Sequence, residues 1–132
     1  MRISALVLFV SAVCLLGAAC GGNRGGIEVV HPESSSARDS VTISILNDHW
    51  YDARVHAVYG GAMRYPLGVV GNKRDAGPFT IPWHVQPLAI EIDFIIESGR
   101  YVSDEILVDP GDLVELRIPP NIAASGFFRP AP

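Results

Sequence analysis

The residues of this chain that could bind a metal are its four histidines and the two aspartates nearest to one of them. The histidines are His31, His49, His56 and His84, and Asp48 and Asp52 flank His49. No two histidines have the separation of two or four residues that places two imidazoles on one face of a strand or helix. We therefore expect no metal and no cofactor, and Asp48, His49 and Asp52 would be the local ligands if a metal did bind.

Residues suited to catalysis are few. Glu91 and Asp93 are two residues apart, so they share one face of a predicted strand, as the carboxylates of a glycosidase could. On an outward face such residues are more often solvated and balanced across the sheet by a base such as Arg117. A serine nucleophile needs a neighbouring base and an oxyanion site, and no Gly-x-Ser-x-Gly sequence occurs. We expect no catalytic residue and no enzymatic activity.

Two loops contain residue types that bind ions in other proteins, and a simpler structure is expected for both. Asp109-Pro110-Gly111-Asp112 offers two carboxylates, whereas calcium takes about six or more oxygen ligands. Its order of Pro, Gly and Asp is that of a β-turn. The loop 71–77 has glycines and two cations that could hold a phosphate, but it lacks the following helix that such loops use. We interpret it as a solvated connection.

Alternating apolar residues predict strands from residue 41 to residue 118. Between residues 41 and 118 the apolar period is two rather than about 3.6. Seven short runs follow this pattern, around residues 41–45, 55–59, 65–69, 79–81, 88–96, 102–108 and 114–118. Turn residues recur about every 8 to 12 positions, which is typical of a sandwich. We therefore predict an all-β fold, an antiparallel two-sheet sandwich of about seven strands, immunoglobulin-like or transthyretin-like.

Strand direction sorts the loops between the two ends of such a sandwich, because each antiparallel strand reverses the direction of the one before. The first, third and fifth connections, residues 47–52, 71–77 and 97–100, then share one end, which we call the Trp50 end. Loops on a rigid sandwich commonly carry binding function, and aromatic residues among charges are typical of a contact surface. We therefore place the candidate binding surface at this end.

Trp50 and Tyr51 have two other interpretations. They could plug the open end of the core, as large amphipathic side chains do, and this is favoured in a domain that needs all its apolar residues. They could also stack on a sugar or another small ligand, with Asp48, Asp52 or Arg100 as polar partners. The candidate binding residues are His49, Trp50, Tyr51, Asp52, Arg74, Arg100, Phe127 and Phe128.

Phe127 and Phe128 belong to this set because they lie beyond the last predicted strand. They stand between Pro119-Pro120 and Pro130, so two large apolar side chains need a cover. The tail either folds back onto the sandwich, which is the favoured interpretation, or docks in an extended conformation into a partner.

The first twenty residues resemble a bacterial export signal. Arg2 precedes an apolar run over residues 6–16, and small residues precede Cys20. A membrane-spanning helix needs about 20 apolar residues, usually with anchoring residues at its ends, and here the run ends in glycine without an aromatic anchor. Leu16-Gly17-Ala18-Ala19-Cys20 resembles the lipobox of bacterial lipoproteins, where a dedicated peptidase leaves the Cys as the lipid-bearing N-terminus. Ordinary secretion with cleavage after Ala19 and free release is the alternative.

The lipobox resemblance implies a domain attached to a membrane through lipid on Cys20, since several acyl chains anchor stably where a single chain binds reversibly. Gly21 stands where an Asp would resemble an inner-membrane retention signal, which favours the outer membrane in bacteria with two membranes. Residues 21–40 are rich in Gly and Ser and are expected to be a flexible tether, with residues 27–30 as a candidate edge strand. The tether is expected to enter opposite the Trp50 end, which would then face away from the membrane.

The positions of the cysteines and the net charge limit the disulfides and the partners that this chain can be expected to have. Cys14 would leave with the signal and Cys20 would be acylated, so no disulfide is expected and stability depends on the apolar core. The chain has 10 basic and 14 acidic residues, and loss of Arg2 leaves a side-chain charge of about −5. This balance argues against nucleic acid and anionic headgroups as main partners.

These observations predict four segments: a signal peptide at 1–19, the lipidated Cys20 and tether at 20–40, a β-sandwich at 41–118 and a C-terminal tail at 119–132. Short bacterial lipoproteins with one small β-sandwich are similar in this organisation. The predicted function is that of a lipid-anchored cell-envelope protein that acts by non-catalytic binding, with another envelope protein as the expected partner. A glycan or small-ligand binder that uses Trp50 and Tyr51 is the alternative.

Overall fold

The computed structural model describes residues 25–30 and 39–132, which form nine strands and one short 3-10 helix. The strands are β1 (Gly26–Val30), β2 (Ser40–Asn47), β3 (Ala53–Tyr59), β4 (Met63–Val70), β5 (Arg74–Pro82), β6 (Leu88–Phe94), β7 (Arg100–Ser103), β8 (Leu113–Ile118) and β9 (Phe128–Pro130), and the helix is η1 (Ile122–Ala124). The predicted signal peptide, Cys20, His31 and most of the predicted tether lie outside the described residues.

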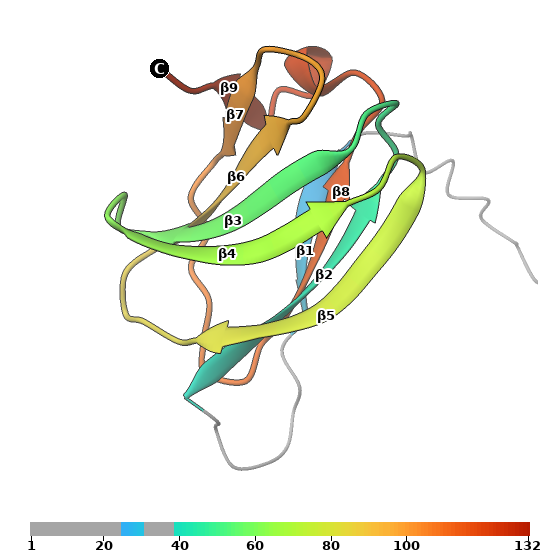
Figure 1. The fold of residues 1–132 in the computed structure, drawn as a ribbon. Helices are drawn as coiled ribbons and strands as arrows, with labels where there is room; N and C mark the ends of the chain where they lie inside the picture. Colours follow the sequence, from blue (N-terminus) through green and yellow to red (C-terminus); the bar gives the residue numbers. More distant parts are fainter. Residues whose placement is uncertain (1–24, 31–38) are drawn as a thin grey trace, which may run out of the picture.

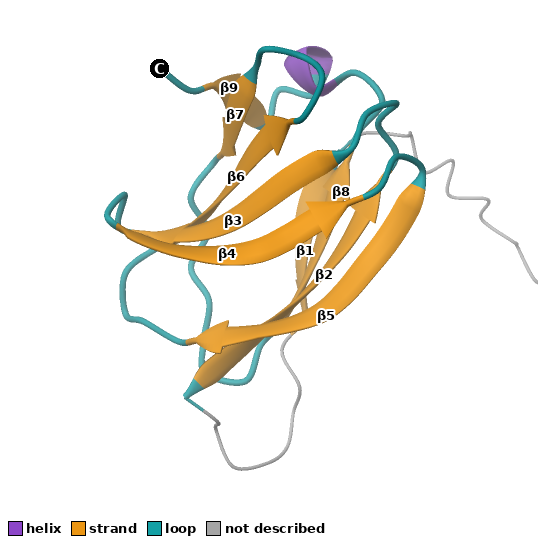
Figure 2. Ribbon diagram, viewed as in Figure 1, coloured by secondary structure: helices purple, strands orange, loops and turns teal. Residues whose placement is uncertain are grey.

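The strands form two sheets that pack face to face (Figures 1 and 2). The first sheet has the order β1-β8-β2-β5 and the second the order β4-β3-β6-β7-β9. The predicted all-β sandwich is confirmed. Its strand pairs are antiparallel except β2 and β8, which run parallel. An even number of chain reversals separates these two strands, so they point the same way when they become neighbours.

The core is built by the alternation that predicted the strands. Val41, Ile43 and Ile45 of β2 are at most 1% exposed, while the residues between them are only half-buried. The fully buried side chains of β3 and β6, in the other sheet, face them, and together with those of the neighbouring β8 they form one continuous apolar cluster. The largest fully buried side chain among the described residues is Tyr59, at the end of β3.

Two strands lie outside the predicted domain boundaries. β1 pairs with β8 from within the predicted tether, so residues 27–30 do form an edge strand, and Ile27 and Val29 pack against the core. β9 pairs with β7 from within the predicted tail. Phe128 is 3% exposed, and Phe127 packs partly buried against the core. The tail folds back onto its own sandwich, as the favoured interpretation predicts.

The run predicted as a strand over residues 102–108 is shorter in the structure. β7 ends at Ser103, and Ile106 contributes only an isolated bridge to Leu88. The chain leaves the sheet at Asp104, whose carboxylate lies 3.1 Å from a guanidinium nitrogen of Arg129. Tyr101 packs against the core and Ser103 is 1% exposed, so the alternation of β7 leaves Asp104 on the outward side, where it is exposed. In the part of the chain that the structure describes, no helix has the length and apolar character needed to cross a membrane.

Candidate functional site

Three turns meet at the Trp50 end, as strand direction predicted. The backbone N–H of Asn72, between β4 and β5, donates to the Asp52 carboxylate, between β2 and β3, at 2.8 Å. The Asn72 side chain donates to the Trp50 carbonyl at 3.3 Å. The backbone N–H of Ile95, after β6, donates to the Asp52 carbonyl at 3.1 Å. Hydrogen bonds therefore join these turns into one surface.

The buried side chain of Asn47 hydrogen-bonds the backbone of the turns that form this surface. Asn47 is fully buried, and its Oδ1 accepts the backbone N–H of His49 at 2.9 Å. Its Nδ2 donates to the carbonyls of Tyr51, Val70 and Gly71 at 2.9, 3.2 and 3.1 Å. One amide thus satisfies backbone groups from two different turns, which fixes the position of the β2–β3 turn relative to the end of β4.

His49, predicted as a contact residue, is instead part of the core. Its ring is 6% exposed and stacks on Phe94 with centroids 4.0 Å apart. The backbone N–H of Tyr51 donates to His49 Nδ1 at 3.3 Å, so the proton of the neutral ring belongs on Nε2. Burial lowers the pKa of His49, Lys73 lowers it further, and Glu97 opposes both. His49 therefore closes this end of the core, the role predicted for Trp50 and Tyr51.

Trp50 projects into solvent. It is 66% exposed and Tyr51 is 37% exposed, so the prediction that these residues plug the core is wrong for Trp50. Lys73 Nζ lies 4.0 Å from the centroid of the Trp50 ring and also donates to the Asp48 carbonyl. Lys73 lies in the β4–β5 connection and has the left-handed φ of 54°. A cation on one face of the ring helps to hold its orientation.

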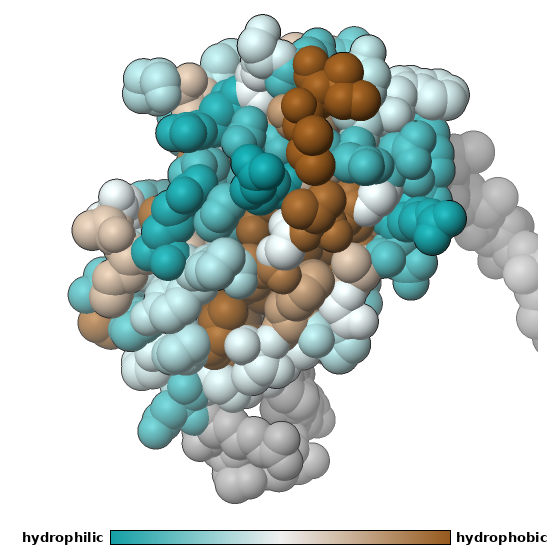
Figure 3. All heavy atoms as spheres, viewed as in Figure 1, coloured by the Kyte–Doolittle hydropathy of each residue, from teal (hydrophilic) through white to brown (hydrophobic). Residues whose placement is uncertain are grey.

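Two further apolar side chains at this end were not predicted as surface residues. The alternation predicted residues 88–96 as one strand, but β6 ends at Phe94. Ile95 and Ile96 consequently lie in the β6–β7 loop and are 50% and 78% exposed. Figure 3 shows apolar side chains gathered at the end of the sandwich where β6 ends. The sequence signal was the pair Ile95-Ile96 itself, which breaks the alternation before Glu97-Ser98-Gly99.

The other candidate residues have separate places. Asp52 is half-buried within its turn, and Arg74 is exposed at the start of β5. Arg100 lies on the outer face of the second sheet, with Nε 3.3 Å from Glu91 Oε1, and does not join the loops. Phe127 and Phe128 pack against the core and each other, so they offer no free docking segment.

The paired carboxylates on β6 belong to a network of ion pairs. Glu91 Oε1 lies 2.5 Å from Arg64 Nη2, and Asp93 Oδ2 lies 3.4 Å from Arg54 Nη1. The expected partner, Arg117, is in the other sheet and pairs with Asp48 at 2.5 Å. Arginines from β3, β4 and β7 therefore balance these acids, and the arrangement is that of a solvated sheet face.

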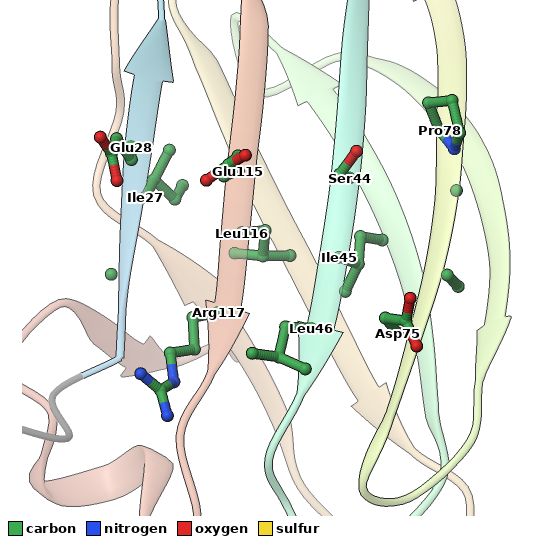
Figure 4. A pocket seen from close by; sticks show the side chains of 13 residues that line it. Ile27, Glu28, Ser44, Ile45, Leu46, Asp75, Pro78, Glu115, Leu116 and Arg117 are labelled. Carbon is green, nitrogen blue, oxygen red and sulfur yellow. The ribbon is translucent and has the colours of Figure 1, made fainter.

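An open groove of about 920 Å³ lies on the outer face of the first sheet. Figure 4 shows one row of its lining side chains, in which Glu28 and Glu115 are neighbours and Ser44 follows on β2. Glu28 and Glu115 are directly opposite each other in the β1–β8 register. Like charges in this position repel each other and weaken the pairing of the edge strand. Within the described ranges, no three His, Cys, Asp or Glu side chains come together as metal ligands would.

The described chain begins at the Trp50 end, which corrects the predicted orientation. β1 runs antiparallel to β8, and its first residue, Gly26, pairs with Arg117 near the end of β8. Gly25 packs so closely on the residue after β8 that an added Cβ would lie 2.4 Å from Pro119 Cδ. The extra strand β1 reverses the chain once more than the seven predicted strands allowed. The described chain therefore begins on the side of Trp50 and not on the opposite side.

Comparison with known proteins gives no match: no family model, no curated protein and no solved structure matches this chain. What the fold establishes is the class, a two-sheet β-sandwich.

The buried histidines predict a pH dependence of stability. Burial is the main cause that lowers the pKa of both His49 and His56, and the guanidinium of Arg64 adds to the effect at His56. Each ring is therefore neutral in the folded state at pH values where the unfolded chain, with a pKa near 6.5, already binds protons. The free energy of unfolding should be constant above this pH with respect to these groups and should fall as the pH drops below it.

Urea unfolding from about pH 8 to about pH 5 measures this dependence. The variants His49→Gln and His56→Gln should each have a shallower decline than the wild type, since glutamine does not titrate. An identical decline in the double variant would show that other groups cause it.

Proposed function

We propose that this chain is a lipid-anchored domain of the bacterial cell envelope that acts by non-catalytic contact through the Trp50 end. The observation that carries the proposal is that Trp50 is 66% exposed on a turn held by the buried Asn47. Because the turn that bears this ring is already held in place, binding costs little further conformational entropy. Aromatic rings of this kind are enriched in the centres of contact surfaces.

The lipobox resemblance at residues 16–20 supports the anchor, with the outer membrane as the proposed location where a bacterium has two membranes. Gly25 is five positions after Cys20. Even a fully extended chain of that length spans at most about 17 Å. Because Gly25 lies beside Pro119 at the Trp50 end, the proposed anchor and the proposed contact surface are on the same side of the domain.

A glycan or small-ligand site at Trp50 has weaker support. Its three expected polar partners are engaged within the domain, since Asp48 pairs with Arg117, Asp52 accepts the N–H of Asn72, and Arg100 pairs with Glu91. One face of the tryptophan is occupied by Lys73. A sugar would have to use the other face without these groups.

Site-specific photo-crosslinking in living cells tests the proposal. A probe at Tyr51 in the Trp50 end is compared with a probe at Val85, which is 76% exposed in the connection between β5 and β6 at the opposite end. Adducts are identified on gels and by mass spectrometry, so that both protein and lipid partners are detected. We expect adducts from Tyr51 and none from Val85. Equal labelling from both positions, or labelling from Val85 alone, would refute the Trp50 end as the contact surface.

A further inference from the structure

We propose that the Trp50 end rests directly on the lipid surface, with Trp50, Ile95 and Ile96 inserted into the interfacial region. The inference rests on the proposed anchoring through Cys20 and names lipid as the partner of the same surface.

The exposed apolar residues are those that favour a membrane interface. Trp and Tyr have amphipathic rings suited to the headgroup level, and exposed isoleucines bury apolar area in the acyl boundary. Trp50 and Tyr51 lie in the β2–β3 turn, and Ile95 and Ile96 lie in the adjoining β6–β7 loop. The N–H of Ile95 bonded to the Asp52 carbonyl joins these two loops, so their side chains belong to one surface.

The opposite end exposes the aliphatic side chains of Val85 and Leu107, but among the residues that the structure describes it has no aromatic side chain that is mainly exposed. Its aromatic side chains are buried or half-buried: Tyr59 is in the core, and Trp83 Nε1 donates to the Val108 carbonyl at 2.7 Å. Tyr65 Oη is 2.7 Å from His84 Nε2. Among the described residues, the mainly exposed aromatic side chain, Trp50, therefore lies at the end where the described chain begins.

The length of the link makes contact with lipid difficult to avoid. If Cys20 carries lipid, its acyl chains lie in the bilayer, and the five positions from Cys20 to Gly25 span at most about 17 Å. A folded domain held this closely touches the bilayer with the end from which the link departs. Gly25 marks that end through its contact with Pro119.

Local charge indicates that the contact is apolar. Lys73 and Arg74 are exposed at this end, and the exposed acids Asp75 and Glu97 balance them, while the charge of the exposed Arg100 is paired with Glu91. A surface without net charge gains little from anionic headgroups, so binding should persist on zwitterionic lipid and change little with salt.

Quenching of tryptophan fluorescence by brominated lipid tests the inference, because the two tryptophans lie at opposite ends. The full lipidated protein is reconstituted into phosphatidylcholine vesicles with bromine near the carbonyl end of the acyl chains. Trp83→Phe leaves Trp50 as the emitter, and Trp50→Phe leaves Trp83. We expect the emission of Trp50 to fall about twofold and that of Trp83 to be unchanged. If Trp83→Phe does not fold, the difference between wild type and Trp50→Phe gives the same quantity.

A matched pair of substitutions tests the role of the apolar loop. Ile96 and Leu107 are 78% and 77% exposed, and Leu107 lies in the connection between β7 and β8. Ile96→Asp should remove most of the quenching of Trp50, whereas Leu107→Asp should leave it unchanged.

Two other results would contradict the inference and can be told apart. Protein that floats with the vesicles while Trp50 is not quenched is anchored but does not rest on lipid. A Tyr51 crosslink to a protein would then identify the true partner and leave the proposed function intact. Protein that does not float lacks the lipid, and both proposals fail.

Discussion

Replacement of Asn47 by alanine is expected to lower the free energy of unfolding by about 3 to 4 kcal/mol. The side chain is fully buried and bonds four backbone groups, the N–H of His49 and the carbonyls of Tyr51, Val70 and Gly71. Alanine leaves these groups without that partner, and an unsatisfied buried group costs about 1 to 3 kcal/mol before partial hydration at the turn reduces the total. Urea unfolding followed by circular dichroism measures the loss.

Asn72→Ala is the matched control for this prediction. It also removes an asparagine amide that bonds a carbonyl of the β2–β3 turn, but that bond to Trp50 is 3.3 Å long and exposed. Its loss should cost less than about 1 kcal/mol. Equal effects of the two substitutions would show that Asn47 does not hold the Trp50 end as the hydrogen bonds indicate.

Much of the fold follows from local pattern, because alternation reports directly on burial in a strand. Val41, Ile43 and Ile45 predicted both the first strand of the sandwich and its inward face, and these residues are buried. The same alternation extended β6 through Ile96, since it records apolar character and not where the backbone leaves the sheet. Ile95 and Ile96 were therefore missed as surface residues.

The alternation of apolar residues does not show which strands, distant in the sequence, pair with each other. β1 is only five residues long and lies in a Gly-rich stretch, and its place beside β8 depends on an open sheet edge. That one strand places the start of the described domain at the Trp50 end and not at the opposite end, where the chain was predicted to enter. Similarly, nothing in the His49-Trp50-Tyr51 run shows which ring faces inward, because that depends on Phe94 across the sandwich.

Replacement of Cys20 by serine is expected to abolish lipid attachment completely. The lipobox resemblance implies that the Cys20 thiol is the acceptor of the lipid, and the other cysteine, Cys14, lies within the predicted signal. Serine has no thiol, so no thioether-linked lipid can form at this position. Several acyl chains hold a protein on a bilayer stably, and their loss removes the anchor.

The central claim, that lipid on Cys20 anchors the domain beside Trp50, is tested most directly by the mass of the N-terminal peptide of protein isolated from membranes. We predict a peptide that begins at Cys20 and carries the mass of its acyl chains, with no such species in Cys20→Ser. An unmodified peptide that begins at or after Cys20, or a peptide that still contains residues 1–19, would contradict the account.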